Sequence, residues 1–154
     1  MQKDVSVSEQ QPVFNIEKIY VKDLSLEIPH APAIFLEREQ PQIDMQLHNE
    51  ATKIDEGYFE ASITITVTAK LGDKTMFLAE ATQAGIFQIR NVPAEDMDPV
   101  LGIGCPNILF PYVRETISDM VNRSGFPPVI LSPINFEALY AQKQAADAGQ
   151  AQTH

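Results

Sequence analysis

The chain has 154 residues and carries 11 Lys and Arg against 21 Asp and Glu, which gives a formal net charge of −10 at pH 7. This charge argues against a nucleic-acid binder and against docking on an anionic membrane surface, because both partners attract Lys and Arg. The length suits one domain, and a domain of this size buries roughly 68–70% of the surface of its unfolded chain. With 44% hydrophobic residues, the composition favours a globular core.

The single cysteine, Cys105, excludes an intramolecular disulfide framework and a cysteine-rich zinc module. The first residues lack the apolar segment of a secretory signal, and no stretch approaches the roughly 18 apolar residues of a membrane span. We therefore expect a cytoplasmic protein in which Cys105 is a small buried thiol. The polar residues 1–12 predict a disordered tail, residues 13–140 a single domain, and the Ala- and Gln-rich residues 141–154 a flexible tail.

The first apolar segment, residues 14–28, changes its alternation twice. Its apolar residues fall on one parity, then the other, then the first again: Phe14 and Ile16, Ile19 and Val21, and Leu24, Leu26 and Ile28. Such a change predicts a strand with a bulge or twist. It is also compatible with a strand that is covered on both faces, as at an oligomer contact.

Three further segments are typical of strands. Residues 43–47 alternate with period two, and residues 59–69 place apolar and polar side chains on opposite parities. Gly72 and Asp73 break this pattern, and residues 77–89 follow at hairpin distance. One buried and one wet face predict an antiparallel sheet.

The C-terminal part has helical patterns. We expect a short helical piece around residues 94–101 and a longer helix over residues 107–123, with Gly125 as its C-terminal stop signal. A proline-rich apolar connector covers residues 126–133, and a short helix begins near Asn135, a candidate N-cap. Strands followed by helices predict an α+β fold.

Residues with catalytic or cofactor chemistry are not arranged in any recognisable site. The histidines, His30, His48 and His154, lack metal-ligand spacing, and the glycines near residue 104 and residue 72 match neither a dinucleotide turn nor a phosphate loop. We expect no metal, no cofactor and no enzyme activity.

Two features could carry binding. Acidic residues occur on the strand-like segments at Glu17, Asp23, Glu27, Glu60 and Glu80. If several share the wet face, they form an acidic surface for a basic partner, and otherwise they form a solvated face. The proline-broken apolar residues 28–36 and 126–131 either cover a core or line a groove for an extended apolar peptide.

At these segments the chain resembles the SecB family of protein-export chaperones. The matching stretches are IYVKDLSLEIPHAP (residues 19–32), QAGIFQI (83–89), CPNILFPYVRE (105–115) and GFPPVILSPINFEALY (125–140). The resemblance implies a four-stranded antiparallel sheet, a long helix and a short C-terminal helix, assembled as a homotetramer, a dimer of dimers. It implies an ATP-independent function: unfolded precursor proteins are bound, kept competent for translocation and delivered to the SecA motor.

The resemblance also implies site residues. It assigns docking of the basic, zinc-containing tail of SecA to Asp23, Glu27, Leu78 and Glu80. It assigns the client groove to Phe35, Phe126, Val129, Leu131, Phe136 and Tyr140, and subunit contacts to the strand around Ala79, Ala81 and Gln83. Many relatives carry Trp where this chain has Glu39. The alternative hypothesis is a domain that binds a small apolar ligand, and an enzyme is the third hypothesis. Unlike a chaperone, neither of these would bind unfolded chains.

Overall fold

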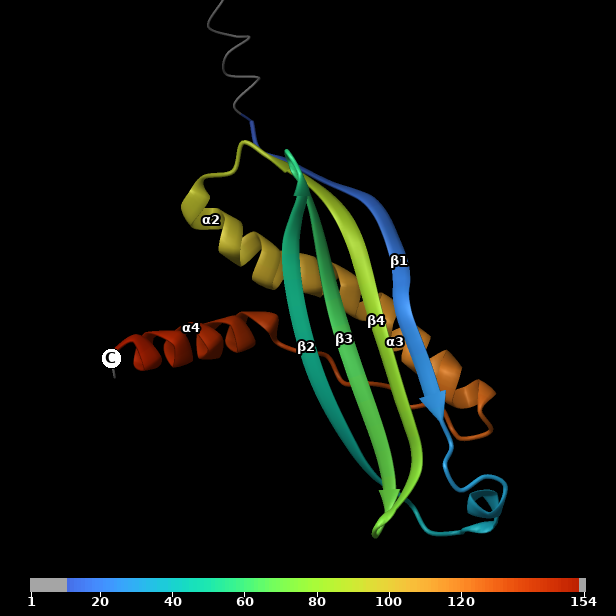
Figure 1. Cartoon of the computed structure of the whole chain (residues 1–154). Coiled ribbons are helices and arrows are strands. Elements are labelled where there is room, and N and C mark those ends of the chain that lie inside the picture. The colour runs from blue at the N-terminus through green and yellow to red at the C-terminus, as the bar shows by residue number, and fades with distance from the viewer. Residues whose placement is uncertain (1–10, 153–154) are drawn as a thin grey trace, which may run out of the picture.

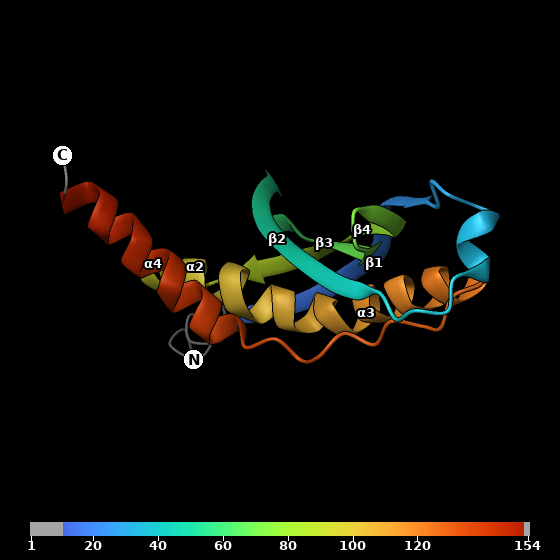
Figure 2. The same ribbon diagram turned by 90° about the horizontal axis from the view of Figure 1, so that it is seen from below.

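The computed structural model describes residues 11–152 as one antiparallel sheet with a helical layer on one side (Figures 1 and 2). The strands are β1 (Val13–Glu27), β2 (Gln42–Asp55), β3 (Tyr58–Leu71) and β4 (Lys74–Arg90), in the order β1-β4-β3-β2. The helical elements are the 3₁₀ turn η1 (Ala33–Leu36), α2 (Ala94–Pro99), the π-helical η2 (Val100–Gly104), α3 (Cys105–Arg123) and α4 (Phe136–Gln152). The α+β prediction is confirmed.

The predicted hairpin is the centre of the sheet. Strands β3 and β4 pair along their length, from Tyr58 opposite Gln88 to Leu71 opposite Lys74. The turn between them places Gly72 at φ +59°, a left-handed conformation that glycine adopts without strain. Alternation along both strands separates a helix face, which packs against α3, from an open face, which no described helix covers.

Strand β1 contains two bulges, so the bulge prediction is confirmed. Its register against β4 shifts between Ile16 and Lys18 and again between Val21 and Asp23. Each extra residue reverses the parity of the residues that follow it. This explains why the apolar residues of β1 change parity twice and still share the helix face.

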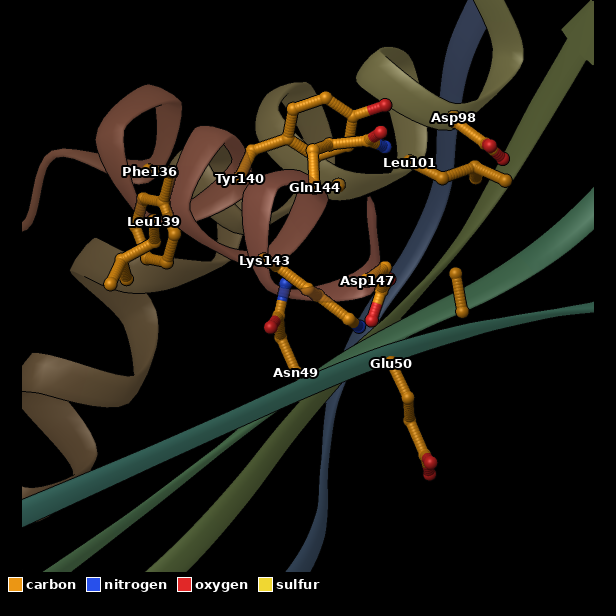
Figure 3. Close-up of a pocket in the computed structure, with 12 residues that line it drawn as sticks. Asn49, Glu50, Asp98, Leu101, Phe136, Leu139, Tyr140, Lys143, Gln144 and Asp147 are labelled. Atoms are coloured by element: carbon orange, nitrogen blue, oxygen red, sulfur yellow. The ribbon is translucent and has the colours of Figure 1, made fainter. Parts of the chain in front are cut away.

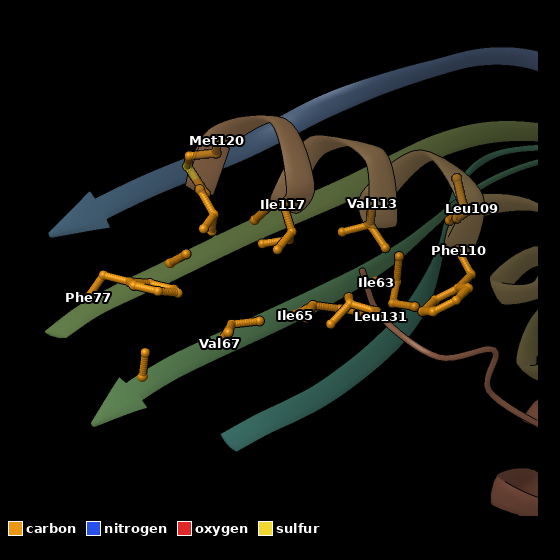
Figure 4. Close-up of a cluster of buried hydrophobic side chains, with 14 of the residues drawn as sticks. Ile63, Ile65, Val67, Phe77, Leu109, Phe110, Val113, Ile117, Met120 and Leu131 are labelled. Atoms are coloured by element: carbon orange, nitrogen blue, oxygen red, sulfur yellow. The ribbon is translucent and has the colours of Figure 1, made fainter. Parts of the chain in front are cut away.

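The core lies between the helix face and α3 (Figure 4). Side chains from β3, β4, α3 and the connector interdigitate, and the labelled ones are Ile63, Ile65, Val67, Phe77, Leu109, Phe110, Val113, Ile117, Met120 and Leu131. A fully buried aliphatic or aromatic side chain contributes about 1.5–3 kcal/mol relative to an exposed one. This packing fixes the diagonal path of α3 across the sheet in Figure 1.

The helices differ from the predictions in two respects. The expected short piece around residues 94–101 runs through η2 into α3 without a break. Helix α3 ends as expected at Arg123, and the predicted stop residue Gly125 follows it with φ +99°. Helix α4 has 17 residues rather than being short, because Ala and Gln have high helix propensity and continue it past Tyr140.

Asn135 is the predicted N-cap of α4. Its side-chain oxygen accepts a hydrogen bond from the backbone N–H of Ala138 at 3.0 Å. Of the predicted tails, residues 1–12 and 141–154, residues 1–10 and 153–154 lie outside the described residues. Residues 141–152 of the predicted flexible C-terminal tail are instead part of α4.

Candidate functional site

The four residues predicted to dock SecA lie together on the open face. In the β1–β4 pairing, Glu27 stands opposite Leu78, and Asp23 stands opposite Thr82. Glu80 lies between them along β4, opposite Ser25. Residues directly opposite each other in an antiparallel pair point to the same face. Three carboxylates and one leucine therefore form a continuous surface, which we call the acidic surface.

A threonine from β3 positions one carboxylate of the acidic surface. The Thr66 hydroxyl donates a hydrogen bond to Glu80 Oε2 at 2.8 Å. One step along the same face, the hydroxyls of Thr64 and Thr82 are 2.8 Å apart. The hydrogen bond restricts the side chain of Glu80, which is only partly exposed. The alternation of Thr with apolar residues along β3 was the available sequence signal for this contact.

Glu60, another of the acidic residues on strands, does not contribute a free charge to this surface. Its carboxylate accepts hydrogen bonds from the Lys22 ammonium at 2.8 Å and from the Tyr20 hydroxyl. The hydrogen bonds of Lys22 and Tyr20 hold the pKa of Glu60 below its ordinary value. Burial, followed by the hydrogen bond to Glu60, raises the pKa of Tyr20 to about 12. The Glu60 charge is thus neutralised by Lys22, a partner that no local sequence pattern indicates.

The remaining acidic candidate, Glu17, is the extra residue of the first bulge. It lies ten residues before Glu27 on the strand, away from the acidic surface. Three of the five carboxylates thus lie together on the open face, and their role in docking stays a prediction.

Three of the six predicted client residues line one groove. Phe35, Phe126 and Val129 surround a groove of about 510 Å³ between the β1–β2 loop and the connector. The rings of Phe35 and Phe126 are stacked with their centroids 4.9 Å apart, and the ring of Phe77 lies 5.1 Å from that of Phe126. Glu37 and Glu39 add carboxylates to the lining. We call this hollow the aromatic groove.

The other three predicted client residues lie elsewhere. Leu131 and Phe136 are 6% and 2% exposed and belong to the core, where the Phe136 ring packs edge-on against Phe110. Tyr140 lines a second hollow of about 300 Å³ between α4, η2 and β2, whose rim includes Phe136. Figure 3 shows Tyr140 on the η2 side of this hollow, near Leu101. Gly102 permits this approach, because a Cβ there would lie 2.9 Å from the Tyr140 ring.

The predicted subunit-contact residues are covered within the single chain. Ala79, Ala81 and Gln83 are 0%, 1% and 4% exposed on the helix face of β4. The Gln83 side-chain oxygen accepts a hydrogen bond from the Thr116 hydroxyl of α3 at 3.2 Å. Because these residues pack against α3, a substitution there would affect assembly by changing the position of α3. Their role in subunit contacts stays a prediction.

The helix face of β1 is only partly covered by α3. Helix α3 lies over β3 and β4, and four apolar side chains of β1 remain 40–51% exposed: Phe14, Ile16, Val21 and Leu24. A hollow between β1 and α3 is lined by Leu24, Leu26 and Met120 together with polar residues of α3. We call the four exposed side chains, Phe14, Ile16, Val21 and Leu24, the apolar strip of β1.

Cys105 is buried as predicted, at the start of α3. Burial raises the pKa of its thiol to about 12, so it is a poor nucleophile at neutral pH. Within the described part of the chain, no three His, Cys, Asp or Glu side chains gather closely enough to hold a metal ion. Among residues 11–152, no helix combines the length and apolar character needed to cross a membrane.

Comparison with known proteins identifies the family to which the chain belongs. Residues 7–147 match the family model of the preprotein translocase subunit SecB. The protein-export protein SecB of Chromobacterium violaceum is 66% identical over 145 residues, covering 93% of this chain and 97% of that protein. The SecB of Thiobacillus denitrificans is 64% identical over 148 residues, covering 94% and 97%.

A solved structure has the same fold. It is a SecB-like chaperone of Mycobacterium tuberculosis in complex with a ChAD peptide from the HigA1 antitoxin, with 17% identity and a TM-score of 0.64. The match covers 79% of this chain and 90% of that one. On the family model and the high-identity relatives, this chain belongs to the SecB family of protein-export proteins.

Proposed function

We propose that this protein is an ATP-independent protein-export chaperone that binds unfolded precursor proteins in the aromatic groove. The observation that carries the proposal is the 44% exposed ring of Phe35 in an open groove, stacked on the largely buried ring of Phe126, on segments that also match the SecB family. Its relatives are described as protein-export proteins, and the distant structural neighbour was solved with a bound peptide. The proposed activity is binding and release, with no chemical reaction.

Clients are recognised by what folding hides, namely apolar side chains and unpaired backbone. Each buried apolar Å² contributes roughly 25 cal/mol, offset by the ordering of the client chain. Many weak contacts along one client therefore act together. A client that folds rapidly buries its apolar segments before capture, which makes selection kinetic. The groove carboxylates Glu37 and Glu39 favour clients with basic residues near the apolar segment.

A test uses neighbouring residues as matched variants. Phe35 lines the aromatic groove, whereas the adjacent Leu36 is 78% exposed and does not. Phe35→Ser is expected to weaken capture of a slow-folding client diluted from denaturant, and Leu36→Ser to leave it intact. Complex mass is measured by light scattering. Equal capture by both variants and the unsubstituted protein would place the client elsewhere.

The alternative hypothesis, a domain that binds a small apolar ligand, predicts a different result in the same experiment. A ligand-binding domain would be saturated by a small apolar compound and would ignore the unfolded client. Family membership and the open groove favour the chaperone reading.

The acidic surface is the proposed docking site for the basic, zinc-containing tail of SecA, so the zinc belongs to the partner. Asp23, Glu27 and Glu80 supply three negative charges, and Leu78 supplies an apolar contact. The aromatic groove lies on other elements, the β1–β2 loop and the connector. Client capture and SecA docking are therefore separable.

Asp23→Ala combined with Glu80→Ala is expected to weaken docking of the SecA tail and leave client capture unchanged. Glu95→Ala with Glu137→Ala removes the same charge from exposed positions on α2 and α4, and is expected to leave both activities unchanged. Equal loss of both activities in the Asp23/Glu80 variant would refute the separation.

A homotetramer, a dimer of dimers, is the proposed assembly. The apolar strip of β1 supports it, because exposed apolar patches of this kind mark protein–protein contacts. Several copies of the groove would raise the effective concentration for one long client. Leu24→Asp, which places a charge in the strip, is expected to lower the mass measured by light scattering. An unchanged mass would move the contact to another surface. The proposed location is the cytoplasm, where precursors wait before export.

A further inference from the structure

Lys22 and Asp23 are neighbours in the chain and also share the open face. In a regular strand, consecutive side chains point to opposite faces. Here Lys22 is the extra residue of the second bulge, between Val21 opposite Gln83 and Asp23 opposite Thr82. The bulge therefore brings a lysine to the border of the acidic surface.

The contacts of Lys22 direct it away from Asp23. Its ammonium lies 2.8 Å from Glu60 Oε1, and the Tyr20 hydroxyl donates to Glu60 Oε2, so both carboxylate oxygens are engaged. Glu60 stands opposite Ile86, six residues along β4 from Glu80. At 3.4 Å per residue this is about 20 Å from Glu80 along the sheet. Glu60 thus holds the ammonium toward the far end of the open face.

Beyond this pair, the open face carries a second positive charge. Lys18 stands opposite Ile86, in the same row as Glu60. Along β1 the charges therefore change sign, from Lys18 and Lys22 to Asp23 and Glu27. On the far side of the second bulge, Lys18 and Lys22 are matched by Glu60 and by Glu50, which stands opposite Ser62 on the same face. A basic partner segment therefore meets net attraction only on the side of Asp23 and Glu27.

We propose that Glu60 is a positioning residue of the docking surface: by binding Lys22 it keeps a positive charge off Asp23, and so sets where a basic partner can bind. This inference rests on the proposed docking of a basic segment at the acidic surface. The partner it fits has its Lys and Arg residues clustered over Asp23, Glu27 and Glu80, and a neutral segment over the Lys22–Glu60 pair. Without Glu60, the flexible stem of Lys22 lets its ammonium reach the adjacent Asp23 carboxylate and compete with the partner.

The test is a double-mutant cycle on binding of the zinc-loaded SecA tail peptide, measured at 0.15 M salt on the full-length chaperone. Glu60→Gln is expected to weaken binding about three- to ten-fold, since the released lysine neutralises Asp23. In the Lys22→Gln background, the same substitution is expected to change affinity less than about two-fold, because Glu60 itself lies beyond the Debye length of about 8 Å from the acidic surface. Equal weakening in both backgrounds would overturn the proposal.

Tyr20→Phe is the control for packing. It removes the second hydrogen bond of Glu60 but leaves the Lys22–Glu60 pair, and is expected to bind the peptide within about two-fold of the unsubstituted protein. A loss as large as that of Glu60→Gln would mean that disturbed packing, not the lysine, is responsible, and would also overturn the proposal. Asp23→Ala with Glu80→Ala tests the docking site separately: if that variant binds normally, the site itself is wrong, whatever the cycle gives.

Discussion

The ring of Phe35 lies against the place where a side chain at position 125 would be. Gly125 adopts φ +99°, and a Cβ built on it would lie 3.0 Å from Phe35 Cε1. The stacked pair of Phe35 and Phe126 therefore depends on the residue that also ends α3. Gly125 therefore determines both the position of the Phe35 ring in the aromatic groove and the direction of the chain after α3.

Gly125→Ala is expected to destabilise the fold by about 1–3 kcal/mol, the cost of a non-glycine residue in a sparsely populated conformation. It should also displace Phe35 and weaken client capture. Urea unfolding and the light-scattering assay measure the two effects. Gly104→Ala is the control, because Gly104 has helical angles and open space around its Cβ, so it should be neutral or stabilising. Similar losses in both variants would contradict the role given to Gly125.

Alkaline pH should destabilise the protein through Tyr20. A phenol whose pKa is raised in the folded state stabilises the fold below its ordinary pKa of 10.0, and this contribution is lost as the pH rises toward about 12. Unfolding midpoints measured between pH 9 and about pH 11.5 should therefore fall more steeply for the unsubstituted protein than for Tyr20→Phe. The chain has four tyrosines, and the difference in tyrosinate absorbance between the two proteins reports the titration of Tyr20 alone. Parallel curves would show that Tyr20 titrates like an exposed phenol.

Cys105 should be almost unreactive in the native protein. Burial raises its pKa to about 12, so at pH 8 little thiolate is present and reagents lack access. Labelling with a thiol reagent is expected to be slow in buffer and fast in concentrated urea. Ser132→Cys in a Cys105→Ala background provides an exposed thiol on the connector and should react rapidly in both conditions. Rapid native labelling of Cys105 would indicate that the start of α3 opens frequently.

Asn135→Ala should loosen α4 without unfolding the domain. The lost cap hydrogen bond to the Ala138 N–H costs about 1 kcal/mol. Because most side chains of α4 are exposed, the effect stays local. Hydrogen exchange of the α4 amides should accelerate while the urea midpoint of the sheet stays unchanged. Asn135→Asp keeps an acceptor oxygen and should exchange like the unsubstituted protein.

Local pattern predicted much of this fold. Alternation along residues 59–69 defined β3, and the parity changes in residues 14–28 predicted the bulges that the register shows. The helix end before Gly125 and the cap at Asn135 follow from residue chemistry that acts over a few positions. The length of α4 was underestimated because an apolar stripe was required, whereas Ala and Gln extend a helix without one.

The site was less accessible, because it depends on pairings across the sheet. Family resemblance predicted the docking role of Asp23 and Glu80. No local sequence pattern relates Lys22 to Glu60, because they are 38 residues apart in the chain. Burial separated the predicted client residues: Phe35 borders a groove, while Leu131 and Phe136 fill the core. An apolar residue on a connector has the same sequence signature in either place, so only packing distinguishes them.

The two bulges make β1 two residues longer than the stretch of β4 that it pairs with, since 15 residues from Val13 to Glu27 face the 13 from Leu78 to Arg90. Removing Glu17 or Lys22 would straighten the strand and leave every other pairing and facing direction in place. Removing Leu24 instead would force either a new bulge or a slip that turns acidic residues toward the core. A deletion scan of β1 should therefore find two tolerated positions in an otherwise intolerant strand, and natural length variation should concentrate at the same two places.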